Sequence, residues 1–97
     1  MATSKLIKQF KTPDFSTYNN RTVCNGVSQS LTFSEDRFVI GWIVGTGTGY
    51  AVVYDGTVEV ISCPKQSPCA VSFVLKAGHQ LRTNNVGEYH LNAWKMS

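Results

Sequence analysis

Apolar and polar positions alternate with a period of two along most of the chain beyond residue 17, as they do in strands that bury one face. Turn-forming pairs such as Asn25-Gly26 and Asp55-Gly56 interrupt the alternation at near-regular intervals. The interruptions delimit about eight short predicted strands, at residues 18–24, 28–33, 38–44, 50–54, 57–63, 70–76, 80–83 and 89–95. No helix is predicted between them, so the pattern indicates an all-β fold, an antiparallel sandwich or small barrel.

The most apolar predicted strand, residues 38–44, carries hydrophobic side chains on both faces. One face presents Phe38, Ile40, Trp42 and Val44, and the opposite face presents Val39, Gly41 and Ile43. Two apolar faces predict either a central strand or a strand whose second face is covered by a partner. We assign three residues to the candidate oligomer interface: Val39, Ile43 and Trp94.

The first 17 residues form a separate segment in this interpretation, an N-terminal arm or edge segment before a β-sandwich domain at residues 18–97. Leu6, Ile7 and Phe10 have the spacing of a short helix, and they also suit an edge strand. Pro13 ends either structure. An arm that docks on a neighbour and a frayed terminus are both consistent with this pattern.

Composition narrows the class of protein. The 97 residues are 42% hydrophobic and 15% charged with a net charge of +3, which suits a folded domain and argues against disorder. The basic residues are scattered, so no nucleic-acid partner is predicted. No apolar signal core follows Met1, and no apolar stretch approaches the ~20 residues of a spanning helix. We therefore expect synthesis in the cytoplasm without a secretory leader, and no membrane insertion.

Three cysteines, Cys24, Cys63 and Cys69, bear on redox chemistry. Free structural thiols are the default in a reducing compartment. A Cys63–Cys69 bridge is the alternative, because Pro64 and Pro68 favour a turn between them. A lone C-x5-C spacing does not supply the ligands of a zinc site, and we predict no metal and no cofactor.

Catalytic constellations are not evident in the sequence. His79 and His90 are the only histidines, and neither has a nucleophile or carboxylate specified by spacing. Glu35-Asp36 lies in a predicted turn, where neighbouring carboxylates diverge. The glycines of residues 45–49 lack the Lys-Ser/Thr of a phosphate-binding loop. The sequence therefore predicts a non-enzymatic protein.

If consecutive strands cross a jelly-roll-like β-sandwich up and down, the connections alternate between its two ends. The loops at residues 25–26, 45–49, 63–69 and 84–88 then share the end away from both termini, with all three cysteines near it. Loops on a rigid scaffold are frequent binding surfaces. The candidate binding-end residues are Thr46, Gly47, Thr48, Tyr50, Lys65, Gln66, Asn84, Asn85 and Tyr89. Tyr50 and Tyr89 begin strands there and suit contact, although core packing is the alternative for both.

The segment at residues 30–94 resembles the C1q/TNF-like jelly-roll heads of phage tail-fibre tips, receptor-binding proteins and related bacterial surface fibres. The resemblance consists of a polar-alternating strand at 30–33, a strong strand at 38–42 after an acidic turn, a glycine-rich loop, a hairpin at 53–58 and the step Val74-Leu75-Lys76-Ala77-Gly78-His79-Gln80-Leu81. The chain departs from the pattern at His79, where Asp or Gln is common, and in its Cys63–Cys69 loop.

This resemblance implies a homotrimer whose protomers pack sheet against sheet around a threefold axis. It implies a virion structural part, either a tail-fibre or receptor-binding protein or a decoration protein. Its partners would be other virion proteins and a host-surface glycan or protein. The alternative is a stand-alone carbohydrate- or protein-binding β-sandwich module.

Overall fold

Antiparallel strands make up most of the part of the chain that the computed structural model describes, residues 11–24, 31–47, 49–64 and 67–97. A single turn of 3-10 helix, Tyr18–Asn20, precedes the first strand, because the Thr17 side chain caps it by accepting a hydrogen bond from the Asn19 amide. The eight strands are β1 (Arg21–Val23), β2 (Leu31–Thr32), β3 (Arg37–Gly45), β4 (Ala51–Asp55), β5 (Val58–Cys63), β6 (Cys69–Leu75), β7 (Gln80–Asn84) and β8 (Val86–Lys95).

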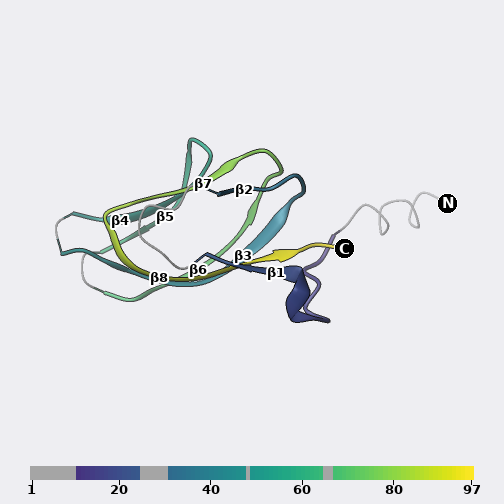
Figure 1. Cartoon of the computed structure of the whole chain (residues 1–97). Helices are drawn as coiled ribbons and strands as arrows, with labels where there is room; N and C mark the ends of the chain where they lie inside the picture. The colour runs from purple at the N-terminus through teal and green to yellow at the C-terminus, as the bar shows by residue number, and fades with distance from the viewer. Residues whose placement is uncertain (1–10, 25–30, 48, 65–66) are drawn as a thin grey trace, which may run out of the picture.

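The strands form two four-stranded sheets, with orders β1-β8-β3-β6 and β2-β7-β4-β5 (Figure 1). Four of the antiparallel pairs are those that a single long hairpin would form: β1 with β8, β2 with β7, β3 with β6 and β4 with β5. Rolling that hairpin so that β3 also meets β8, and β4 also meets β7, produces the double-sheet arrangement of a jelly roll. The predicted all-β antiparallel sandwich is confirmed.

The core lies between the inner faces of the two sheets. Its fully buried side chains include Val39, Ile43, Val71, Leu75 and Leu91 from one sheet and Val53 and Cys63 from the other. The assignment of Val39 and Ile43 to an oligomer interface is therefore wrong. Both lie on the face of β3 that packs against the second sheet, whereas Trp94 pairs with Phe38 and lies on the opposite face.

Gly41 permits the close approach of the two central strands of this sheet. It has φ +152°, and an added Cβ would lie 1.7 Å from the backbone oxygen of His90. A glycine inside a strand often marks such an approach. The central position of β3, which the sequence predicted, therefore requires a residue without a side chain at position 41.

Connections alternate between the two ends of the sandwich, as expected for the described loops. The proximal end comprises residues 33–37, 55–57 and 76–80, and the Gly78 amide donates to the Phe33 carbonyl there. The β2–β3 and β6–β7 turns of this end lie toward the side of the molecule that carries the C-terminus (Figure 1). The described residues of the distal end are 45–47, 49–50, 63–64, 67–69 and 84–88, and the Thr46 amide donates to the Asn85 carbonyl there. The predicted Asn25-Gly26 turn lies outside the described residues.

Two details differ from the predicted layout. Cys24 lies near the middle of its sheet and not at the distal end, because its amide donates to the carbonyl of Leu91, the partner of Gly41. The predicted loop at residues 84–88 shrinks to a corner at Asn85, whose φ of 59° is a conformation that Asn tolerates better than most side chains. Residues 1–10 of the predicted arm lie outside the described residues, and Pro13 forms an isolated bridge with Met96.

Candidate functional site

Chemistry based on a metal or an enclosed pocket has no counterpart in the described residues. They contain no group of three His, Cys, Asp or Glu side chains placed to hold a metal ion, and no pocket. The same residues include no helix long and apolar enough to cross a membrane. The candidate sites are therefore surfaces: the outer face of one sheet, the distal end and a polar network at the proximal end.

The outer face is the side of the β1-β8-β3-β6 sheet that points away from the core. Its apolar side chains remain partly open to solvent: Ile40 and Trp42 are each 38% exposed, Val74 is 42% exposed and Val23 is 47% exposed. β3 contributes only Phe38, Ile40, Trp42 and Val44 to this face, all uncharged. Contiguous exposed apolar surface of this kind marks interaction sites.

Aromatic contacts organise this outer face. The rings of Trp42 and His90 stack with their centroids 3.9 Å apart, and His90 Nε2 lies 3.4 Å from Glu88 Oε2. Phe15 reaches the same face at the proximal end, where its ring packs edge-on against Trp94 at 4.8 Å and against Phe38 at 6.3 Å. The segment that follows Pro13 therefore covers the part of the face around Trp94 and leaves Ile40 and Trp42 partly exposed.

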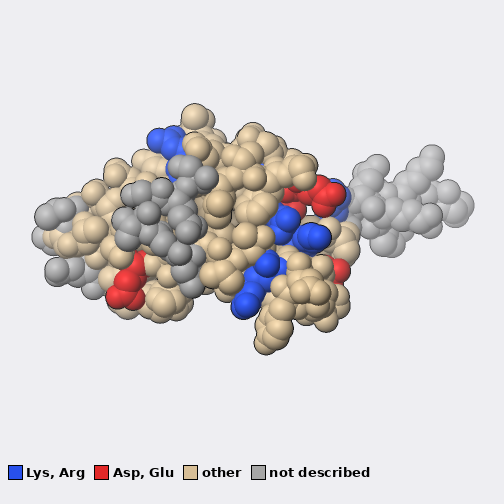
Figure 2. All heavy atoms as spheres, in the orientation of Figure 1, with Lys and Arg blue, Asp and Glu red and all other residues tan. Residues whose placement is uncertain are grey.

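Charged side chains are unevenly placed over the molecule. In the view of Figure 2, lysine and arginine side chains gather toward the end that carries the C-terminus, and uncharged residues make up most of the rest of the described surface. The surface therefore offers no continuous basic track of the kind that follows a nucleic-acid backbone in this view.

The distal end brings together several of the predicted binding residues. Tyr50 is 62% exposed, and its carbonyl accepts a hydrogen bond of 3.3 Å from the Asn85 side chain. Thr46, Asn84 and Asn85 are exposed beside it, whereas Gly47 is half-buried. Thr48, Lys65 and Gln66 lie outside the described residues.

Tyr89 does not belong to this surface. It pairs with Ile43 on the inner face, is 6% exposed, and its hydroxyl forms a hydrogen bond with Thr83 Oγ1. The prediction that Tyr89 binds a ligand is therefore wrong, and the core-packing alternative is correct. Its place in the core follows from the alternation along β8, in which Tyr89, Leu91 and Ala93 share the buried face.

Two of the three cysteines form a disulfide bridge, and the third is a free thiol. Cys63 and Cys69 form a disulfide with a Cα–Cα distance of 6.1 Å, which links β5 to β6 and so joins the two sheets at the distal end. Cys24 is free and 1% exposed, and its Sγ donates to the Thr22 carbonyl. Burial raises the pKa of the Cys24 thiol to about 11, which leaves it a protonated, unreactive group at neutral pH.

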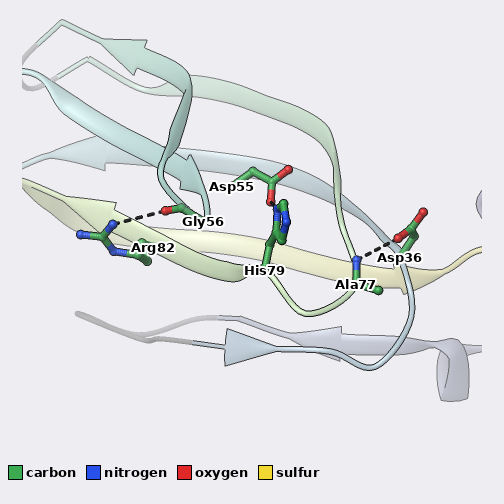
Figure 3. A network of polar contacts seen from close by, with 6 residues as sticks. All are labelled: Asp36, Asp55, Gly56, Ala77, His79 and Arg82. Atoms are coloured by element: carbon green, nitrogen blue, oxygen red, sulfur yellow. Dashed lines mark hydrogen bonds and ion pairs between the residues drawn. The ribbon is translucent and has the colours of Figure 1, made fainter.

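A polar network joins three turns at the proximal end (Figure 3). His79 Nδ1 lies 2.8 Å from Oδ1 of Asp55, which is 8% exposed. The Asp36 carboxylate accepts from the Ala77 amide at 2.8 Å, and Arg82 donates to the Gly56 carbonyl at 3.3 Å. A His–Asp pair also occurs in hydrolytic triads, but every cysteine lies away from this end, so none can serve as its nucleophile. The network's clear effect is to hold the turns together.

Sequence reasoning missed the Asp55–His79 pair. The two residues are 24 positions apart in the chain. Asp55 ends β4 and His79 lies in the turn before β7, so they are brought together by the β4–β7 pairing, in which Asp55 lies opposite Leu81. A signal existed in the shared end predicted for the turns at 55–56 and 77–79, which places the two side chains in one neighbourhood. Comparison of the chain with protein families, with curated proteins and with solved structures finds no match.

Proposed function

We propose that this chain is a non-enzymatic structural module of a phage or prophage particle, which assembles as a homotrimer through the outer face of its β1-β8-β3-β6 sheet. It would serve as a tail-fibre or receptor-binding protein or as a decoration protein. The observation that carries the proposal is the partly exposed stripe of Ile40, Trp42 and Val74 on a sheet whose other face is already buried. Tyrosine and tryptophan side chains are favoured anchors of protein interfaces.

Three further points support it. Double-sheet jelly rolls are frequent in viral capsid proteins and in lectins, although that is an analogy of fold and not of function. The spacing resemblance to phage fibre heads covers residues 30–94, the same part of the chain that forms β2 to β8. Trp94, assigned to the interface from the sequence, lies on the proposed face and is packed against Phe15.

The assembly is tested by measuring mass in solution with light scattering and native mass spectrometry. A mass three times the 10.7 kDa of one chain, or a multiple of that, supports the proposal. Trp42→Lys places a charge in the middle of the outer face and should give a folded protein, by circular dichroism, that no longer forms trimers. Val58→Lys is the matched control, because Val58 is 60% exposed on the other sheet. A wild-type monomer at micromolar concentration would refute the trimer.

The phage assignment is tested separately by the reading frames that flank this one. Tail or capsid genes beside it would support a virion role, whereas metabolic genes would contradict it. This observation is independent of the mass measurement, since a trimer can serve in many assemblies.

A second candidate is a carbohydrate- or protein-binding module, which the 62% exposure of Tyr50 at the distal end favours. An exposed tyrosine beside Asn85 offers a ring for stacking on a sugar and an amide for its hydroxyls. Glycan-array signal that is lost in Tyr50→Ala would support this function. Tyr18→Ala is the matched control, because Tyr18 is 77% exposed at the start of the 3-10 turn. Glycan-array signal that persists in Tyr50→Ala would exclude Tyr50 at the distal end as the glycan-binding site.

A further inference from the structure

Among the strands that the structure describes, β6 has the least protected outer edge. β6 pairs with β3 over seven consecutive residues, from Arg37↔Leu75 to Ile43↔Cys69, without a register shift. It is the last strand of its sheet, so within the described residues its other side pairs with no strand. A straight, regular edge of this kind is a template for another strand.

The other three edges carry features that discourage pairing. β1 has three residues and β2 has two, which is too short for an extended ladder. β5 carries the exposed Glu59 and a register shift against β4 next to Tyr54. Short length, charge and bulges are the devices by which natural sheets block their edges. β6, with the sequence CAVSFVL, has no charge, no proline and no bulge.

The side chains of β6 also suit a partner. Val71 and Leu75 point into the core, whereas Ala70, Ser72 and Val74 are exposed on the outer face. These exposed residues pair with Trp42, Ile40 and Phe38 of β3, respectively. A strand added at this edge would therefore extend both the core layer and the apolar outer face.

We propose that the β6 edge binds the β6 edge of a second copy of this chain, antiparallel, around a twofold axis at Ser72. The strand is self-complementary, because it has no charge that could meet a like charge. In an antiparallel pair that keeps the outer faces on one side, a residue must lie opposite its own copy. Full overlap of Cys69–Leu75 then places Ser72 opposite Ser72, Val71 opposite Phe73 and Ala70 opposite Val74.

This contact is distinct from the outer-face trimer and goes beyond it. A twofold edge contact alone gives a dimer, whereas a twofold axis that meets a threefold axis at right angles gives a closed hexamer. In either assembly, two four-stranded sheets join into one continuous sheet across the axis.

Cross-linking tests the register directly. Cα atoms of directly opposed residues in an antiparallel pair lie about 4.5–5.5 Å apart, within the range that a disulfide spans. Ser72→Cys should therefore form a disulfide-linked dimer under mild oxidation, seen as a doubled mass on a non-reducing gel. Ser34→Cys is the control, an exposed serine in the turn before β3, and should remain largely uncross-linked. Equal cross-linking of the two variants would overturn the proposal.

A charge at the axis tests the contact without a new thiol. Ser72→Lys places two like charges opposite each other and should halve the mass of the assembly, whereas Ser34→Lys should leave it unchanged. Amide hydrogen exchange along β6 should rise at least tenfold in Ser72→Lys. An unchanged mass would overturn the proposal, and so would a wild-type monomer whose β6 amides are all protected, since its own chain would then cover the edge.

These outcomes separate the edge contact from the proposed trimer. A wild-type dimer that Ser72→Lys dissociates and Trp42→Lys does not would support the edge contact and refute the trimer. A wild-type trimer that Trp42→Lys dissociates, and whose Ser72→Cys variant forms no disulfide-linked dimer, would do the reverse.

Discussion

At the scale of single residues, Gly41 is the position where the fold tolerates least change. A methyl group there would collide with the His90 carbonyl oxygen, which belongs to the backbone of β8 and cannot rotate away. We expect Gly41→Ala to lower the free energy of unfolding by about 3 kcal/mol or more, measured by urea denaturation. Gly78→Ala is the comparison: an added Cβ has nothing within 4 Å there, and only its φ of +79° opposes the change. Equal losses in the two variants would contradict the close approach of β3 and β8.

The buried thiol of Cys24 supplies a second test at this scale. Because burial raises its pKa to about 11 from the ordinary 9.0, we expect no alkylation by iodoacetamide at pH 7.5 in the folded protein and rapid labelling in urea. The sign of the pH effect follows from the same shift. The unfolded chain releases the proton first, so the free energy of unfolding should fall as pH rises from about 9 toward about 11. Fast labelling of the native protein would contradict the burial of Cys24.

The two histidines differ in the burial of the carboxylates that they face. Loss of His79 leaves the nearly buried Asp55 carboxylate without its imidazole partner, so we expect His79→Ala to cost about 1–2 kcal/mol in urea denaturation. His90→Ala is the matched control, because the Glu88 side chain it faces is 65% exposed. That variant should cost less than about 1 kcal/mol through its ion pair. A larger loss in His90→Ala would show that the Trp42 stacking dominates.

For residues 38–44, the sequence predicts the two faces of the strand but not which of them is buried. The alternation along residues 38–44 correctly separates Val39 and Ile43 from Phe38 and Trp42. It does not say which set is buried, because both sets are apolar and either could face the second sheet. The packing of the two sheets decides the question, because it buries Val39 and Ile43 and leaves Ile40 and Trp42 partly exposed. The same packing buries Tyr89.

At the scale of elements, turn chemistry located most strand ends, since Asp55-Gly56 and the glycines near residue 47 interrupt the alternation. The 3-10 turn and the start of β8 were not predicted, because each depends on the conformation of a single residue. Thr17 caps a 3-10 turn where the alternation predicted the start of a strand. Asn85 turns the chain with a positive φ and lets β8 begin at Val86, so the predicted loop at 84–88 is mostly strand.

The link between β5 and β6 is the covalent element of the fold. The Cys63–Cys69 bridge closes a short loop, and short loops remove modest entropy from the unfolded chain. We expect the double variant Cys63→Ser, Cys69→Ser to remain folded, with a free energy of unfolding lower by about 2 kcal/mol. Wild-type protein treated with a reductant should show the same loss, and Cys24→Ser, which keeps the bridge, should lose the same amount on reduction. A wild-type protein indifferent to reductant would contradict a stabilising bridge.

At the scale of the whole molecule, the jelly-roll order followed from few assumptions. Eight strands with alternating apolar residues and short connections can form a jelly roll, because each strand then buries its apolar face between the two sheets. Whether a partner covers the outer face is decided by the surface of that partner as well as by this chain. Trp42 and Ile40 show that the face is apolar, and their pattern is the same whether a copy or another protein covers them.

The proposed outer-face contact would have a thermodynamic consequence that a single chain cannot produce. Subunits that bind only when folded stabilise the folded state by mass action, so the midpoint of thermal unfolding rises with protein concentration. We expect this rise in wild-type protein over a hundredfold range of concentration, measured by calorimetry. Trp42→Lys should remove it, because the charge would be desolvated in the interface. Val58→Lys should retain it, and a wild-type midpoint independent of concentration would mean that the exposed stripe of Ile40, Trp42 and Val74 stays in water.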